Sequence, residues 1–121
     1  SDVCSSDLYL KLQTNRQITD SKMQPLMEKL SSLTAGLLSK SENYVMVVIQ
    51  PGVHMLYSGT TAPTAFIEFK SIRLPETETA TLSEKLTDFL VNELKIHANR
   101  IYIEFQDQPA NLWGFNGGTF G

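Results

Sequence analysis

The chain has 121 residues, of which 41% are hydrophobic and 19% charged, so it can build the core of one domain but not of two. Its net charge of −3 argues against a nucleic-acid binder, because such proteins normally carry a basic patch for the phosphate backbone. The longest apolar run, residues 44–49, is far shorter than the roughly 20 residues of a membrane helix. We therefore expect no nucleic acid and no membrane as a partner.

The content of cysteine and histidine argues against a disulfide and against a metal centre. Cys4 is the only cysteine, and the two histidines, His54 and His97, lie far apart in the sequence. Residues 1–7 lack the basic start and the apolar stretch of a secretory signal. We therefore expect a soluble, cytoplasmic protein without a metal ion.

Residues 1–7 are small and polar, without the periodicity that begins at Leu8. We interpret them as a lead-in that does not conform to the rest of the chain, and residues 8–121 as a single domain. Leucines at positions 8, 10 and 12 alternate with Tyr9, Lys11 and Gln13, which predicts a half-buried strand.

A helix is predicted next, because apolar residues from Met23 to Leu37 recur at spacings of three and four. Ser21 and Gln24 have the spacing of a capping box, and Pro25 is expected in the first helical turn. The β-branched run at residues 44–49 predicts a central strand that is buried on both faces.

The second half repeats this order of elements. Residues 64–71 alternate as a strand, and leucines and a phenylalanine between Leu82 and Leu94 form a helical stripe behind a capping box at Thr81 and Glu84. Residues 101–106 alternate as a last strand. The tail from Leu112 to Phe120 is aromatic and rich in glycine.

Two strand–helix–strand units therefore follow one another, and the same separation of 36 residues divides Leu8 from Tyr44 and Thr64 from Arg100. Two βαβ units of this kind predict an α/β (α+β) fold with a four-stranded mixed sheet and two helices on one face. The other face would carry tyrosine, lysine and glutamate. Such a face is often covered by oligomerisation.

No general catalytic motif, such as a Walker loop or a nucleophile elbow, occurs in the sequence. The glycine-rich residues 114–121 end the chain, so no helix follows them to bind phosphate. Trp113, Phe115 and Phe120 are either plain packing residues or one wall of an apolar pocket.

Short segments spread over residues 8–120 resemble the macrophage migration inhibitory factor family of the tautomerase superfamily. In chain order they are Thr14-Asn15, Lys40 ahead of Tyr44, Pro51, Gly59 and Pro63, Ser71-Ile72, Arg100-Ile-Tyr102-Ile, Asp107 and Trp113-Gly-Phe-Asn-Gly-Gly-Thr-Phe120. Each segment alone is a weak signal, and their order and spacing together are fairly specific.

The resemblance implies a homotrimer with pockets at the subunit interfaces. It implies keto–enol tautomerisation of small aromatic α-keto acids, of the phenylpyruvate or dopachrome type, without a metal or cofactor. The family's general base is an N-terminal proline that is exposed when methionine is removed. A secondary amine in an apolar pocket has a lowered pKa and can accept a proton near neutral pH. By family analogy, release from the cell without a leader is also expected, and whether a protein receptor exists is left open.

The resemblance also assigns site residues. Lys40 corresponds to the lysine that binds the substrate carboxylate, and Ile72 lines the pocket beside the base. Tyr102 and Glu104 would enter the pocket from a neighbouring subunit. Aromatic walls fall on Trp113, Phe115 and Phe120.

One departure from the family concerns the base itself. The position of the proline is occupied by Leu8, whose nitrogen is an amide and cannot accept a proton. We interpret residues 1–7 as non-native and expect the natural protein to begin Met-Pro-Tyr9 or similarly. Residues 64–67, where some relatives carry Cys-x-x-Cys, contain no sulfur, so thiol–disulfide exchange is not expected.

Two alternatives to a tautomerase remain open from the sequence. The first is a non-catalytic trimeric protein with a binding or cytokine-like signalling role, which Leu8 favours. The second is a ferredoxin-like ligand-sensing module, which shares the double βαβ arrangement but fits the aromatic tail poorly.

Overall fold

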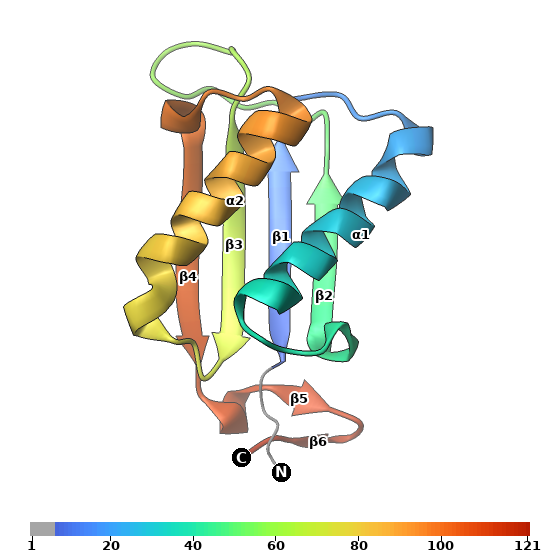
Figure 1. Cartoon of the computed structure of the whole chain (residues 1–121), viewed down its shortest axis with the longest axis vertical. Helices are drawn as coiled ribbons and strands as arrows, with labels where there is room; N and C mark the ends of the chain where they lie inside the picture. The colour runs from blue at the N-terminus through green and yellow to red at the C-terminus, as the bar shows by residue number, and fades with distance from the viewer. Residues whose placement is uncertain (1–6) are drawn as a thin grey trace.

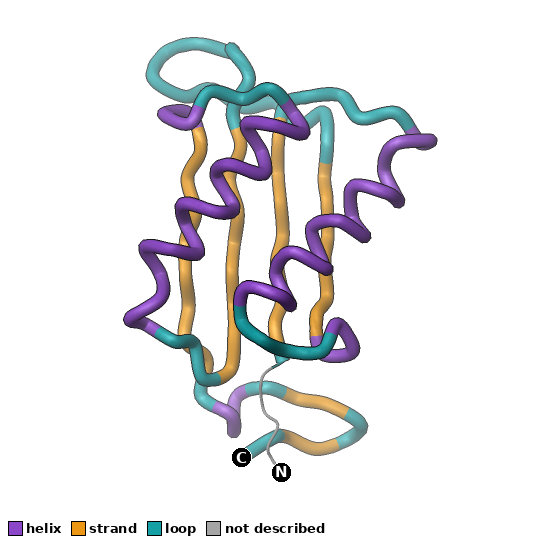
Figure 2. Tube along the Cα trace, in the orientation of Figure 1, coloured by secondary structure: helices purple, strands orange, loops and turns teal. Residues whose placement is uncertain are grey.

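Four strands form one mixed sheet, and two helices cover one of its faces (Figures 1 and 2). A computed structural model describes residues 7–121. The first unit contains β1 (Leu8–Thr14), α1 (Asp20–Leu37) and β2 (Val45–Gln50). The second contains β3 (Ala65–Ile72), α2 (Thr79–Leu94) and β4 (Ile101–Gln108), and a small ribbon of β5 (Gly114–Phe115) and β6 (Gly118–Thr119) follows.

The strand order is β2-β1-β3-β4. Within each unit the two strands are parallel, with Leu8 opposite Val45 and Ala65 opposite Ile101. The units join through β1 and β3, which are antiparallel and place Leu8 opposite Ser71. The predicted architecture of two βαβ units in one four-stranded mixed sheet, with both helices on one face, is confirmed.

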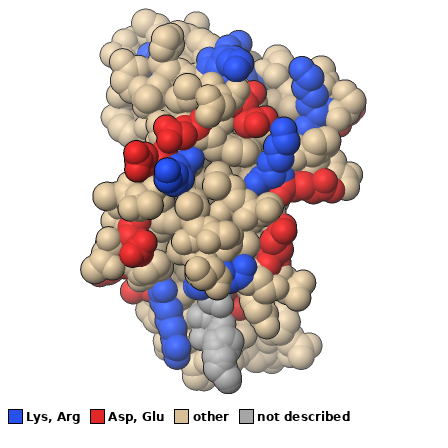
Figure 3. Space-filling model, viewed as in Figure 1, with Lys and Arg blue, Asp and Glu red and all other residues tan. Residues whose placement is uncertain are grey.

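The core lies between the sheet and the helices, because every second residue of β1 and β3 points toward α1 and α2. Leu10, Ile67 and Phe69 are completely buried there, as are Leu30, Leu86 and Leu90 of the helices. Basic and acidic side chains are interspersed over the outer side of the helix layer (Figure 3). Among residues 7–121, neither helix combines the length and the apolar character that crossing a bilayer would require.

The predicted position of the second strand is wrong. β2 is an edge strand with partly exposed residues, and Met46 is 62% exposed. The reason lies in β1, which accepts β2 on one side and β3 on the other and so takes the centre. β2 packs against α1 with one face only, and its apolar run does not distinguish an edge from a centre.

The predicted helix starts are also wrong. Helix α1 begins at Asp20 behind Thr19, and α2 begins at Thr79 behind Glu78, with no side-chain hydrogen bond from either capping position. The Thr19 carbonyl instead accepts bonds from the backbone N–H groups of Lys22 and Met23. Pro25 is therefore the sixth helical residue and not part of the first turn. It faces solvent, where water can bond the Ser21 carbonyl that proline leaves without a helical partner.

This position of Pro25 predicts that Pro25→Ala stabilises the protein. Alanine restores the hydrogen bond to the Ser21 carbonyl and removes the clash of the ring. The unfolded chain gains conformational entropy when proline is removed, which offsets a smaller part of this stabilisation. We expect the free energy of unfolding in urea to rise by about 1–2 kcal/mol. Gln24→Ala, at the exposed neighbouring position, is the control and should change it by less than about 0.5 kcal/mol. A neutral or destabilising Pro25→Ala would mean that the helix starts later.

Candidate functional site

The C-terminal ribbon lies below the end of the sheet at which β1 begins (Figure 1). A hollow of about 580 Å³ lies between residues of this end and of the ribbon. Its walls come from the start of β1, the start of β2 with the preceding turn, the end of β3 and β4, and the ribbon. The lining residues include Leu8, Tyr9, Tyr44, Met46, Lys70, Gln108, Leu112, Trp113 and Phe115. Most of these groups are apolar or aromatic, which suits a small organic ligand.

The ribbon forms the aromatic wall. Phe115 is 63% exposed and stacks on Phe120, with ring centroids 5.5 Å apart and planes 11° from parallel. The Phe120 backbone N–H donates to the Trp113 carbonyl at 3.2 Å. The turn between them contains Gly117 at φ +83°, a conformation that a residue with a side chain rarely adopts. Trp113 and Phe115 therefore line the hollow, and Phe120 supports Phe115.

Leu8 and Ile72 lie next to each other at the sheet end. The Ile72 backbone N–H donates to the Asp7 carbonyl at 3.1 Å, which continues the ladder between β3 and β1. Both side chains are only 1% exposed. The nitrogen of residue 8 therefore sits against apolar surface at the edge of the hollow, as the resemblance expects of the base, but here it is an amide bonded to Asp7.

Lys40 lies beside this position, just beyond α1. Burial lowers the pKa of the Lys40 ammonium, the nearby Asp7 carboxylate raises it, and the Arg73 guanidinium lowers it. For Asp7, burial raises the pKa, whereas a hydrogen bond to its own backbone and the charge of Lys40 lower it. Asp7 lines the hollow and Lys40 does not, but the charge of Lys40 interacts with that of Asp7. A partly desolvated cation next to an apolar hollow favours a carboxylate ligand.

Tyr102 and Glu104 do not reach the hollow of their own chain. Tyr102 pairs with Phe66 on β3, whereas Leu8 pairs with Ser71, five residues further along that strand. This offset places Tyr102 about 16 Å from Leu8 along the strand direction. Tyr102 and Glu104 are exposed on the uncovered sheet face, where only a second copy of the chain could bring them to a hollow.

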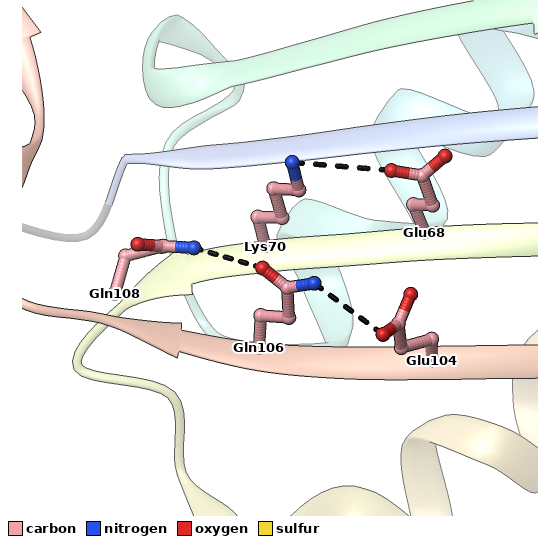
Figure 4. A network of polar contacts seen from close by, with 5 residues as sticks. All are labelled: Glu68, Lys70, Glu104, Gln106 and Gln108. Carbon is pink, nitrogen blue, oxygen red and sulfur yellow. Dashed lines mark hydrogen bonds and ion pairs between the residues drawn. The ribbon is translucent and has the colours of Figure 1, made fainter.

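Several lining residues were missed by the sequence analysis, notably Tyr44, Met46 and Lys70. The Lys70 ammonium lies 3.9 Å from a Glu68 carboxylate oxygen and 5.9 Å from the Tyr9 ring centre. A row of polar contacts on the neighbouring strand leads away from the hollow (Figure 4): Gln108 donates to Gln106 at 2.9 Å, and Gln106 donates to Glu104 at 3.4 Å. The alternation along the strands placed Lys70 and Glu104 on the uncovered face, but it did not show that Lys70 lines a hollow.

A second hollow, of about 550 Å³, lies between the start of α1 and the end of α2 and contains none of the predicted site residues. Two of its four cations, Arg16 and Lys29, are engaged within the fold. Arg16 donates to the carbonyls of Leu94 and Lys95 at 2.9 and 3.1 Å, and Lys29 pairs with Glu93 at 3.5 Å. In the part of the chain that the structure describes, no three His, Cys, Asp or Glu side chains cluster to hold a metal ion.

The surroundings of Lys40 predict opposite effects of its two charged neighbours. Asp7→Asn removes the charge that favours the ammonium and should lower the pKa of Lys40 further. Arg73→Gln removes a repelling charge and should raise it. Titration of the ¹³C-labelled lysine side chains by NMR measures both, with Lys40→Arg to assign the signal. If the two variants shifted the pKa in the same direction, the assigned neighbours would be wrong.

The family model for macrophage migration inhibitory factor (MIF) matches residues 8–121. A macrophage migration inhibitory factor homolog of Brugia malayi is 37% identical over 115 residues, which cover 93% of this chain and 98% of that protein. The D-dopachrome decarboxylase-B of Xenopus laevis is 34% identical over 113 residues, covering 90% and 93%.

Solved structures agree in fold. The homologue from Prochlorococcus marinus is 43% identical and superposes with a TM-score of 0.88 over 93% of this chain and 99% of that one. The protein from Trichinella spiralis is 32% identical with a TM-score of 0.84, over 93% and 99%. Fold, sequence and family model thus converge: the chain belongs to the macrophage migration inhibitory factor family of the tautomerase superfamily.

Proposed function

We propose that this protein, in a form with a free proline amine at position 8, is a keto–enol tautomerase of small aromatic α-keto acids. The observation that carries the proposal is the position of the residue-8 nitrogen. It lies at the mouth of an apolar, aromatic-walled hollow, beside a lysine whose pKa burial has lowered. A base, an anion-binding group and an apolar cleft are what proton abstraction next to a carbonyl needs.

In this mechanism the amine accepts a proton from the carbon next to the carbonyl. The electrons of that C–H bond form the C=C bond, and the carbonyl oxygen takes up a proton to give the enol. Apolar surroundings disfavour the charged form of the amine, so its pKa falls and it is free to act as a base. Lys40 holds the carboxylate, and Trp113 and Phe115 form the apolar wall around the ring. Phe120 supports Phe115, and the buried Ile72 packs beside residue 8.

The proposed assembly is a homotrimer, in which Tyr102 and Glu104 of one subunit enter the hollow of the next. Two features of the single chain support an oligomer. The sheet has one face without helices, on which Tyr102 is 55% exposed, and β2 leaves an open edge with Met46 exposed. No metal ion or cofactor is part of this mechanism.

The amide at Leu8 favours a second candidate function for the chain as printed, namely a trimeric binding or cytokine-like signalling protein that keeps the hollow without the base. We propose that residues 1–7 are a lead-in that does not conform to the tautomerase-like domain of residues 8–121. Residues 1–6 lie outside the described part of the chain, and Asp7 occupies the edge of the hollow.

The proposal predicts that replacing residues 1–8 by Met-Pro, with the methionine removed, creates tautomerase activity. A general base contributes about 10²–10⁴-fold, so kcat/KM for phenylpyruvate should exceed that of the printed chain by at least about 100-fold. The matched control begins Ala-Pro-Tyr9. It keeps the proline ring, but its nitrogen is an amide, and we expect it to be as inactive as the printed chain.

The outcomes of this comparison separate the candidate functions, provided that sedimentation gives the mass of each form. If all three forms are equally active, the amine is not the base. If none is active while all are folded trimers, the chain is a binding protein. A folded monomer at micromolar concentration would contradict the shared pocket, since Tyr102 and Glu104 could then reach no hollow.

Lys40 is expected to set the affinity for the carboxylate. Benzoylformate, an aromatic α-keto acid that cannot enolise, serves as the ligand for calorimetry with the proline form. Lys40→Ala should weaken its binding by about tenfold, the loss of one charge-assisted contact of about 1.4 kcal/mol. Lys22→Ala, on the exposed start of α1, is the control and should leave the affinity unchanged. An unchanged affinity in Lys40→Ala would remove Lys40 from the site.

A further inference from the structure

Two side chains hold the loop between β2 and β3. Asn15 donates from Nδ2 to the carbonyls of Thr61 and Ala62 at 3.0 and 3.1 Å and accepts from the Thr64 backbone N–H at 2.9 Å. Arg100, just before β4, donates from Nε to the Pro63 carbonyl at 2.9 Å and from Nη1 to the Tyr57 carbonyl at 3.1 Å. Its Nη2 donates to the carbonyls of Ala62 and Thr60 at 3.1 and 3.3 Å. One rigid guanidinium thus fixes four carbonyls of a single loop, which a lysine could not do in the same geometry.

Further bonds close the loop on itself and on β4. The backbones of Tyr57 and Thr60 exchange two hydrogen bonds of 3.0 and 3.1 Å around a turn that contains Gly59 at φ +76°. The Thr64 hydroxyl donates to the Arg100 carbonyl at 2.7 Å. Tyr57 is therefore anchored through its backbone to the residue that precedes β4 by one position.

The anchored loop places the Tyr57 ring between Arg100 and Tyr102. The centre of the guanidinium lies 5.1 Å from the Tyr57 ring centre, a cation–π contact. The Tyr57 and Tyr102 rings meet edge to face, with centroids 5.1 Å apart and an interplanar angle of 82°. Phe66 contacts Tyr102 in a similar edge arrangement at 6.4 Å and 74°. Tyr102 is held by two rings although more than half of it is exposed.

Holding the ring of Tyr102 in place matters because its phenol would serve as a hydrogen-bond donor to a ligand. An exposed tyrosine on an open sheet samples several orientations, and fixing a side chain on binding costs conformational entropy. Holding the ring beforehand removes part of that cost. The phenol of Tyr102 keeps its proton at neutral pH and can donate a hydrogen bond. Hydrogen bonding with Tyr57, and then the charge of Tyr57, raise its pKa further.

We propose that Arg100 and Tyr57 are positioning residues for Tyr102: Arg100 fixes the loop that carries Tyr57, and the Tyr57 ring orients the phenol that Tyr102 presents to a neighbouring subunit's hollow. The inference rests on the proposed function for the role of Tyr102, and it adds two residues outside the hollow to the machinery of the reaction. Neither residue touches the substrate in this arrangement.

The kinetic test uses the proline form and phenylpyruvate. Tyr57→Leu and Arg100→Lys should each lower kcat by about tenfold, with KM changed by less than about threefold, because a misplaced donor weakens the transition state more than ground-state binding. Tyr57→Phe keeps the ring and should retain most of kcat. In a Tyr102→Phe background, Tyr57→Leu and Arg100→Lys should cause no further loss. Equal losses in both backgrounds would overturn the proposal, because the two residues would then act on folding or on another part of the site.

A second measurement tests the positioning role of Tyr57 without an activity assay. The ¹³C-labelled tyrosine rings are observed by NMR, and the Tyr102 signals are assigned by their absence in Tyr102→Phe. Tyr57→Leu should shift the Tyr102 ring signals, and Tyr57→Phe should lower the pKa of Tyr102. Unchanged Tyr102 signals in Tyr57→Leu would overturn the positioning role. If the proline form is inactive but these shifts occur, the proposed function fails while the restraint on Tyr102 stands.

Discussion

The antiparallel pairing of β1 with β3 is the contact on which the rest of this structure depends. It joins the two βαβ units from Leu8 opposite Ser71 to Thr14 opposite Ala65, and it gives β1 a partner on both sides. Since side chains alternate, a slip of one residue would turn Leu8 and Leu10 out of the core. The same register places the nitrogen of residue 8 beside Ile72 at the sheet end, so the core and the candidate site are specified together.

Much of this fold could be predicted from the sequence because both units have clear periodicity. Alternating leucines identify β1, and the helical stripes identify α1 and α2. The strand order could not be predicted in this way. It depends on which strand finds partners on both edges, and no local pattern in the sequence reveals that. For this reason β2 was placed at the centre of the sheet and not at its edge. The starts of the helices were also missed. The capping-box patterns at Ser21 and Thr81 lie inside the helices, and the true capping positions, Thr19 and Glu78, make no side-chain hydrogen bond.

For the candidate site, the limit of prediction is the register between strands. Leu8, Trp113 and Phe115 meet at one hollow as the family resemblance expects, and their roles stay predictions. Lys70 and Met46 were missed because both lie opposite Tyr9 of β1, a register that the pattern of β3 or β2 alone does not reveal. Tyr102 could not be placed from one chain at all, since the offset between β1 and β4 carries it to the far end of the uncovered face.

The charges around the residue-8 nitrogen show why the start of the chain matters beyond the supply of an amine. Asp7 is the acidic residue of the hollow, and its carboxylate favours the charged form of Lys40. With proline at position 8 and nothing before it, this carboxylate is gone, whereas the cations Lys40, Lys70 and Arg73 remain, with Lys70 paired to Glu68 at 3.9 Å. Positive charge lowers the pKa of a neighbouring amine and attracts a carboxylate. A free proline would therefore gain a lower pKa and a more favourable site for the substrate from a single change.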